Sequence, residues 1–423
     1  MEIYILKYLF IALIGLLLFA CAGETRAHET FADYPGFKEF YAGRCKDGQP
    51  ISFSDDHDKE LLQRYSPRLI LPPGGRYPID FYRDYLPYTL LRRYKDKAVI
   101  KDEVTQADLR AYQEDTSVYL DLDKKRFLTA GLDQRVGEDK KGAFNGRRPV
   151  VYGRIYREKV ELLDEKSDPH IYDFIFLKYN VVFAISGLPA ELPWGIRALI
   201  WLAGLDPDDW HELDNFVAVH IVLDDKERPV AIILAQHNHH RSYLLGKDIP
   251  LPEDGHIPFD GALRSNEIYQ ASDAPNPVRH RVAPWTIYMK YLLSGEDPPF
   301  TRGEDVTYGV KAGGVEIPYD LDFLSPCDPF YTAKIMLGEP RPFFSKYIGR
   351  DGPPGADYYN IPELLPMGNM LKFSYLHDGD PEDINFAESA IDVKGKKMDI
   401  KKLLDYGGRK LYRDLIDKSP QFR

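Results

Sequence analysis

Aromatic stretches that proline and glycine interrupt at short intervals are the feature that most limits what this chain can fold into. Its 423 residues include 29 Tyr, 22 Phe, 32 Pro and 32 Gly, spread along the whole sequence. Aromatic residues favour strands, whereas proline and glycine mark turns and end regular structure. The sequence therefore predicts an α+β fold that is mainly β, with peripheral short helices and long Pro/Gly-rich loops.

The N-terminus predicts export. An uncharged apolar run extends from Tyr8 to Phe19, directly after Lys7, and the sequence Leu-Phe-Ala-Cys then ends at Cys21. About a dozen apolar residues suit a signal peptide, while a membrane-spanning helix needs ~20. The closing residues match a bacterial lipobox, in which the cysteine thiol receives a diacylglyceryl group before cleavage. We expect residues 1–21 to be a lipoprotein signal peptide and Cys21 to be the acylated residue.

Two outcomes of cleavage stay open. Ala20, Cys21 and Ala22 also satisfy the small-x-small rule of ordinary signal peptidase, which would release a soluble periplasmic or secreted protein. A lipoprotein with Ala22 rather than aspartate after the cysteine is expected to move to the outer membrane of a diderm bacterium. Stable anchoring takes two or more acyl chains, and a triacylated cysteine with palmitate-type chains meets that condition.

The charge of the chain excludes one class of partner. The net charge is -11, and removing residues 1–21 leaves it unchanged because that segment holds only Glu2 and Lys7. Nucleic-acid binding depends on phosphate neutralisation by lysine and arginine, so we expect no nucleic-acid partner. An anionic membrane surface is disfavoured as well. Membrane attachment is therefore expected through the N-terminal lipid and not through charge.

Two cysteines remain after acylation of Cys21, namely Cys45 and Cys327. An even pair in an oxidising compartment predicts a disulfide. Two free, partly buried thiols are the alternative.

The chain divides by composition into four segments. We predict a signal peptide at 1–21, a polar tether at 22–50, a β-sandwich-like domain at 51–330, and a C-terminal extension at 331–423 that packs on the same body. The extension is expected to end in two short helices around Gly407 and Gly408.

Several elements follow from local patterns within the predicted domain. A helix is expected over 55–65 with Ser54 as its N-cap, and strands over 68–71, 149–160 and 171–179. Two β-branched runs, 216–223 and 229–236, are joined by five polar residues and predict a hairpin. A short apolar helix is expected over 196–205, core packing over the aromatic segment 77–94, and surface connections over the proline-rich stretch 250–299.

Histidines gather around the predicted hairpin. His211 and Asp214 lead into its first strand, and His237 and His239 follow its second strand. Strand ends of a hairpin bring such groups within several ångströms, and neutral imidazoles with a carboxylate suit a divalent metal such as Zn²⁺ or Mn²⁺. A solvated polar turn with nothing bound is the other interpretation. The sequence contains no HExxH motif, no paired CxxC motif, no phosphate loop and no GxSxG motif.

The segment 61–71, which reads Leu-Leu-Gln-Arg-Tyr-Ser-Pro-Arg-Leu-Ile-Leu, is followed by Arg-Tyr-Pro-Ile-Asp at 76–80. These residues resemble the opening of the vacuolar-protein-sorting sixty-two-like proteins, which begin with a helix, a Tyr-x-Pro step, a short strand and a Tyr-Pro element. The resemblance extends over roughly 60–270. It implies a β-sandwich core with antiparallel strands and peripheral helices.

A second stretch resembles the same family and, more distantly, the necrosis-inducing toxin-like proteins. Their pattern is His-x-x-Asp-Trp-Glu before a strand, with Ser/Gln-His at the end of its partner. His211, Asp214 and His237 match this pattern, whereas Asn215 and Phe216 stand where the family has Trp and Glu. In the toxin-like relatives that glutamate helps to hold a metal, so phenylalanine there removes a charged ligand.

Three functions remain after this reading of the sequence. The favoured one is a lipid-anchored bacterial envelope protein, not an enzyme, whose β-rich domain binds a glycan, lipid or protein partner. The alternative is a metal-dependent hydrolase that uses His211, Asp214 and His237, in which the metal would lower the pKa of a bound water toward ~7. A membrane-damaging role by analogy with the toxin-like relatives is disfavoured, because an anchor would hold the protein on its own envelope.

Overall fold

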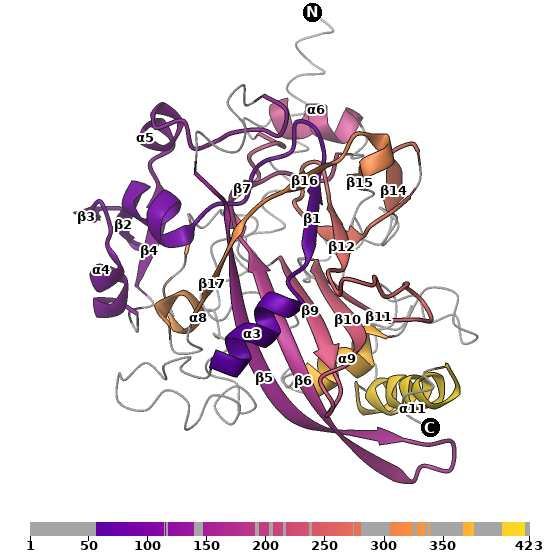
Figure 1. Cartoon of the computed structure of the whole chain (residues 1–423). Helices are drawn as coiled ribbons and strands as arrows, with labels where there is room; N and C mark the ends of the chain where they lie inside the picture. The colour runs from indigo at the N-terminus through magenta and orange to yellow at the C-terminus, as the bar shows by residue number, and fades with distance from the viewer. Residues whose placement is uncertain are drawn as a thin grey trace, which may run out of the picture.

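The computed structural model describes residues 56–418, except 114, 116, 139–146, 191–193, 203–205, 215–216, 237–238, 274, 281–304, 325–327, 334, 336, 339–366 and 376–399. Strands form five sheets in these residues, and helices lie at their margins (Figure 1). Most strand pairs are antiparallel. The parallel pairs are β1 (Arg68–Leu71) with β12 (Pro258–Gly261), and β5 (Val150–Leu163) with β17 (Asp320–Phe323). The fold is therefore α+β and mainly β, as the composition predicts.

The largest sheet has six strands in the order β11-β10-β9-β6-β5-β17. Its strands are β5 (Val150–Leu163), β6 (Pro169–Val181), β9 (Ala218–Leu223), β10 (Pro229–Gln236), β11 (His239–Leu244) and β17 (Asp320–Phe323). The predicted strands over 149–160 and 171–179 are confirmed as β5 and β6. The predicted hairpin is confirmed as β9 and β10, whose turn is closed by the carboxylate of Asp224, which accepts from the amides of Lys226 and Arg228.

Both faces of this sheet are buried over its centre. Register places Ile155, Leu177, Ile221 and Ile232 in one row on the first face, and Tyr156, Phe176, Val222 and Ala231 in one row on the second face. All eight side chains belong to buried core clusters. A strand buried on two faces needs a continuous apolar run, which explains why β9 and β10 lack the usual polar alternation.

The first face packs against helix α3 (Asp56–Arg64) and a four-stranded sheet. That sheet has the order β13-β12-β1-β16, formed by β1 (Arg68–Leu71), β12 (Pro258–Gly261), β13 (Ile268–Gln270) and β16 (Val315–Ile317). The helix and the strand predicted over 55–65 and 68–71 are confirmed, while the proposed cap Ser54 lies outside the described residues. The hydroxyl of Tyr179 donates to the carbonyl of Leu62 at 2.9 Å and fixes α3 on the large sheet.

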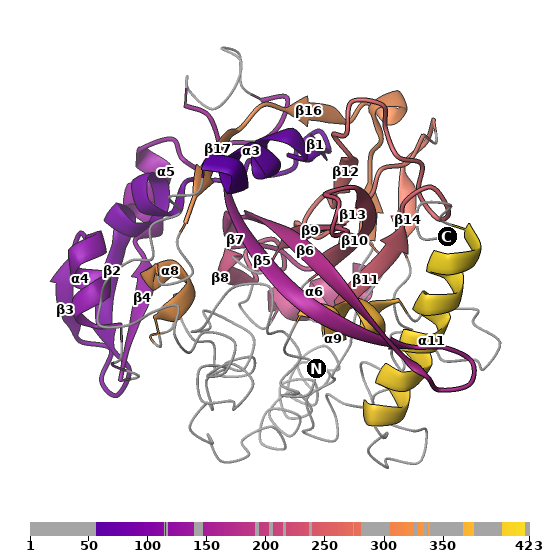
Figure 2. The same ribbon diagram turned by 60° about the horizontal axis from the view of Figure 1, so that its bottom comes forward.

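The second face is covered by α9 (Met367–Ser374) and α11 (Ile400–Lys418). Figure 2 shows these helices on one side of β5 and β6, with α3 and β1 on the other side. The prediction of two short helices around Gly407 and Gly408 is wrong, because α11 is one helix of 19 residues. Burial of Leu411 and Leu415 against the sheet outweighs the low helix propensity of two glycines. A Cβ at Gly408 would lie 3.2 Å from a side-chain carbon of Lys372, so the glycine allows α9 and α11 to approach.

A third buried cluster surrounds a three-stranded sheet of the order β3-β2-β4, at the left edge of Figure 1. Its elements are β2 (Thr89–Arg93), β3 (Val99–Asp102), β4 (Val118–Leu122), α4 (Gln106–Ala111), α5 (Lys124–Thr129), α8 (Pro329–Thr332), a π-helical turn η2 (Phe81–Tyr85) and a 3-10 turn η3 (Leu86–Tyr88). Phe81 and Tyr85 are fully buried, so the aromatic segment 77–94 packs into the core around them as predicted, whereas Tyr94 at its end is 41% exposed.

The remaining elements are short. They are β7 (Phe183–Ser186) paired with β8 (His211–Asp214), β14 (Val278–His280) paired with β15 (Asp305–Thr307), helix α6 (Trp194–Leu202) and the 3-10 turn η5 (Val310–Ala312). Helix α6 agrees with the helix predicted over 196–205. The prediction of surface connections over 250–299 is wrong for β12, β13 and β14, because strands of three or four residues are too short to show alternation. Within the described residues, no helix is long and apolar enough to cross a membrane.

A buried polar contact holds α11 on the sheet and yields the first prediction. The Lys247 ammonium donates to the Asp414 carboxylate at 2.6 Å and to the Tyr375 hydroxyl at 2.8 Å, and that hydroxyl donates to Asp414 at 2.8 Å. Burial opposes ionisation of Asp414, but these donors outweigh it and hold its pKa below the usual range.

Asp414→Ala should lower the free energy of unfolding by about 1–2 kcal/mol, because it removes the acceptor shared by Lys247 and Tyr375, while Lys247 keeps its pair with Asp248 at 3.3 Å. Urea titration measures this loss. Asp414→Asn keeps an acceptor for Tyr375 and should cost less. A loss below about 0.5 kcal/mol for the alanine variant would contradict the role assigned to this contact.

Candidate functional site

Only some of the predicted metal ligands lie within the described residues. The backbone of His211 lies in β8 opposite Ser186, and the backbone of His239 begins β11 opposite Gln236, while His237 lies outside the described residues. Asn215 and Phe216, the two departures from the family pattern, are outside them too. No group of three His, Cys, Asp or Glu side chains suited to a metal occurs in the part of the chain that the structure describes. A metal at His211, Asp214, His237 and His239 therefore stays a prediction.

Asp214 is fully buried and serves a structural contact. One carboxylate oxygen accepts from the side-chain amide of Asn266 at 3.0 Å, and the same amide also donates to the carbonyl of Ile185 at 3.1 Å. Asn266 adopts a left-handed conformation with φ of 60°, which asparagine tolerates better than most residues. Asp214 thus helps to fix the loop that carries Asn266.

The other predicted modification sites lie outside the described residues. Cys21 and Cys45 precede Asp56, and Cys327 falls in the segment 325–327. Acylation of Cys21 and the disulfide between Cys45 and Cys327 remain predictions.

A row of basic side chains crosses the second face of the large sheet. Arg154, Lys178 and His220 occupy adjacent register positions on β5, β6 and β9, and all three are fully buried. The Arg154 guanidinium lies 4.6 Å from the centre of the Tyr156 ring, and His220 Nδ1 lies 3.4 Å from the carbonyl of Ile233. His220 is therefore an internal residue of the sheet and not a member of a hairpin-end cluster.

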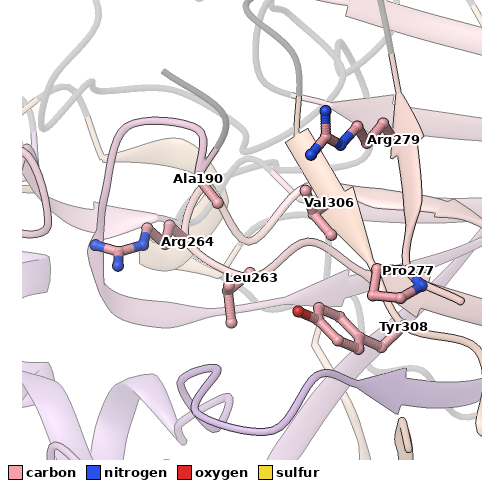
Figure 3. Close-up of a pocket in the computed structure, with 7 residues that line it drawn as sticks. All are labelled: Ala190, Leu263, Arg264, Pro277, Arg279, Val306 and Tyr308. Atoms are coloured by element: carbon pink, nitrogen blue, oxygen red, sulfur yellow. The ribbon is translucent and has the colours of Figure 1, made fainter. Parts of the chain in front are cut away.

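A cavity of about 390 Å³ opens beside the β14–β15 pair. The described residues that line it are Ala190, Leu263, Arg264, Pro277, Arg279, Val306 and Tyr308 (Figure 3). Figure 3 shows Leu263, Val306 and Tyr308 around the cavity and the Arg264 guanidinium directed away from them. Ligand sites typically enclose roughly 300–1,000 Å³ and combine apolar walls with a few polar groups. This cavity is the candidate functional site.

The cavity wall is held by main-chain bonds between segments far apart in sequence. The amide of Leu263 donates to the carbonyl of Val306, and the amide of Gly187 donates to the carbonyl of Arg264. A Cβ at Gly187 would lie 3.2 Å from backbone atoms of Asp208, so glycine permits the close approach of these two segments. The loop that carries Leu263 and Arg264 is thereby fixed on both sides.

Asp305 does not line the cavity but holds its wall together from behind. It is fully buried, and its carboxylate accepts from the amide of Ala190 at 3.1 Å, from the amide of Val306 at 2.7 Å and from the hydroxyl of Ser265. Burial, reinforced by the nearby Glu267, outweighs these donors and raises the pKa of Asp305 to about 6. One carboxyl therefore joins three of the four segments that line the cavity.

Further buried titratable groups lie next to Asp305. The Tyr269 hydroxyl donates to Glu267, and the His280 ring stacks on the Tyr269 ring with 3.8 Å between ring centres. Burial lowers the pKa of His280 to about 4, and it raises the pKa of Asp260, on the neighbouring strand β12, to about 6. These groups sit behind the wall, so they shape the cavity and do not line it.

Arginines gather on the side of the cavity that faces α6. Arg264 and Arg197 both form ion pairs with Asp208. Burial and then the positive charges of Arg197 and Arg135 lower the pKa of Arg264. Burial and Arg135 likewise lower the pKa of Arg76, which pairs with Asp133 at 3.1 Å. Adjacent guanidinium groups favour an anion in their vicinity.

The side chains that line the cavity are apolar groups, two guanidinium groups and one phenol. Its seven described lining residues carry no carboxylate, imidazole or thiol that could act on a substrate. Sequence reasoning missed all of them, because they come from the stretch treated as surface connections and from short strands on either side of it. The dense Pro and Arg content around Pro277 and Arg279 was the available signal.

The comparisons with known proteins add no relative. No protein-family model, no curated protein and no solved structure matches this chain.

Asp305 gives a pH-dependent prediction. Its folded-state pKa of about 6 exceeds the ordinary value of 3.8, so its contribution to stability is full below pH ~4 and is lost as pH rises through ~6. Asparagine resembles the protonated carboxyl and should not lose this contribution. The free energy of unfolding of Asp305→Asn, relative to the unchanged protein, should rise by roughly 2–3 kcal/mol between pH 4 and pH 7.

Denaturant titrations at several pH values measure this difference. Asp225→Asn, at an exposed turn position, is the matched control and should show no such trend. A difference for Asp305→Asn that does not change with pH would mean that the carboxyl is ionised equally in the folded and unfolded states.

Proposed function

We propose that this protein is a lipid-anchored protein of the bacterial envelope whose folded body binds an amphipathic ligand with an anionic group. The observation that carries the binding proposal is the cavity beside β14 and β15, which combines apolar walls with guanidinium groups at its margin. The ligand would place its apolar part against Leu263, Val306 and Pro277, and its charged group near Arg279.

Two features favour an anion over a neutral head group. Arg279 is an exposed residue on the cavity wall and adds a positive charge there. Further positive charge lies behind the opposite wall, where the Arg264 guanidinium pairs with Asp208 and lies near Arg197 and Arg135. Charge-assisted hydrogen bonds from arginine to carboxylate or phosphate are roughly twice as strong as neutral ones.

The anchor part of the proposal is supported by the sequence. The lipobox that ends at Cys21 supports acylation of this residue, and Ala22 rather than aspartate after it supports an outer-membrane location. We further propose that the six-stranded and four-stranded sheets are the two layers of a β-sandwich. In support, Leu69, Phe259 and Ile268 of the smaller sheet share one buried cluster with residues of the larger sheet.

Ligand probes test the cavity. Dodecyl phosphate should bind with a measurable heat in titration calorimetry, and Arg279→Ala should weaken its binding by about tenfold through loss of one charge-assisted contact. Dodecanol, which has the same chain without the charge, should bind more weakly to the unchanged protein.

The control is Arg93→Ala, which removes a half-exposed arginine of β2 that does not line the cavity. It should leave the affinity unchanged. Equal affinity for dodecanol and dodecyl phosphate would refute the anion preference, and no binding of either probe would refute the cavity as the site.

Acylation has its own test. Mass spectrometry of the protein from a diderm host grown with labelled palmitate should find the label on the N-terminal cysteine, residue 21. Cys21→Ser should abolish labelling. A mature chain that begins downstream of residue 21 and carries no acyl group would identify an ordinary signal peptide instead.

A further inference from the structure

Helix α6 displays large apolar side chains to solvent. Trp194 is 84% exposed, Trp201 is 71% exposed and Leu202 is 65% exposed. The helix has nine residues, Trp-Gly-Ile-Arg-Ala-Leu-Ile-Trp-Leu, with one charge among them. A surface helix of a water-facing body normally presents polar residues outward. The exposed side of α6 therefore lacks the composition of a surface that stays in water.

The single charged residue of α6 is paired with a residue outside the helix. Arg197 forms an ion pair with Asp208, and its side chain is 20% exposed. Asp208 also pairs with Arg264 of the cavity wall. Arg197 is three residues after Trp194 and four before Trp201, so all three lie on the same side of the helix. Its guanidinium is paired with Asp208, whereas the two tryptophan side chains stay exposed. Figure 1 shows α6 at the end of the body opposite α11.

Tryptophan is the residue type that favours the boundary between water and hydrocarbon, because its ring is apolar and its N–H is polar. We propose that α6 is a membrane-contact surface that inserts Trp194, Trp201 and Leu202 into the interface of a lipid bilayer. Short helices with such a face lie in the interface plane and do not span the bilayer.

The lipid anchor proposed above favours a bilayer, and not a second protein, as the partner that covers the exposed side of α6. Cys21 and Asp56 are 35 positions apart, and a chain of that length spans at most ~120 Å, so an acylated protein keeps its body within reach of the bilayer. The net charge of -11 predicts that the contact relies on apolar insertion and not on anionic lipids. Because Arg197, Asp208 and Arg264 connect α6 to the cavity, this contact would also bring the cavity to the lipid surface.

Vesicle flotation tests the surface without the anchor. The processed chain that begins at Ala22, which has no acyl group, is mixed with vesicles of dioleoylphosphatidylcholine. The protein should float with them, and the double variant Trp194→Ser/Trp201→Ser should partition at least about tenfold less. A tenfold effect corresponds to ~1.4 kcal/mol, which is roughly 55 Å² of apolar surface and less than one indole ring.

The matched control is Leu128→Ser/Ile171→Ser, which removes two apolar residues that are 55% and 66% exposed on other elements. It should float like the unchanged protein, and all variants should keep the same thermal midpoint. The proposal is overturned if the unchanged protein stays with the aqueous fraction, or if the tryptophan variant floats equally well. It is also overturned if sedimentation shows that the unchanged protein and the control variant are dimers and the tryptophan variant is a monomer, because a second copy would then cover α6.

Since this assay uses no acyl group and no cavity probe, its outcome is independent of the palmitate and dodecyl phosphate experiments.

Discussion

Burial of both faces of the six-stranded sheet is the constraint on which the rest of this structure depends. Rows of Ile, Leu, Val and Phe on β6, β9 and β10 face in both directions, and neither row is stable in water. Two covering layers are therefore required. The N-terminal helix with the four-stranded sheet supplies one layer, and α9 with α11 supplies the other.

Those covers are distant in sequence from the strands they protect, so polar contacts are needed to fix them. The Tyr179 hydroxyl bonds α3 to the sheet, and the contact of Lys247, Tyr375 and Asp414 holds α11. Each such group pays a desolvation cost that its partners offset. The same principle operates around Asp305, where one buried carboxyl accepts from three segments and shapes the cavity wall.

Much of the large sheet could be predicted because its signals are local. The strands β5 and β6 are long and aromatic, and the hairpin β9–β10 has two β-branched runs with a polar turn between them. Helix α3 has acidic residues in its first turn and an apolar pair, Leu61 and Leu62, on its buried side. In each case the sequence pattern that predicts the element lies within the residues that form it.

The cavity could not be predicted in this way. Leu263, Pro277 and Val306 come from strand ends and loops that meet only because the loop after β12 bonds to β7 and β15. The same reason explains α11, since burial against the sheet keeps it helical through Gly407 and Gly408. His211 and Asp214 were grouped by their place before the predicted hairpin and by a family resemblance, whereas in the structure the Asp214 carboxylate accepts from the Asn266 side chain.

The sequence by itself determined the mainly β character, the individual long strands and the expectation of an acylated N-terminus, because propensity and apolar pattern act over a few residues. Only the tertiary structure decided which sheets share a core, which carboxyls are buried, and that two tryptophans of α6 stay exposed. Those properties depend on contacts between residues that are far apart along the chain, and no local pattern records them.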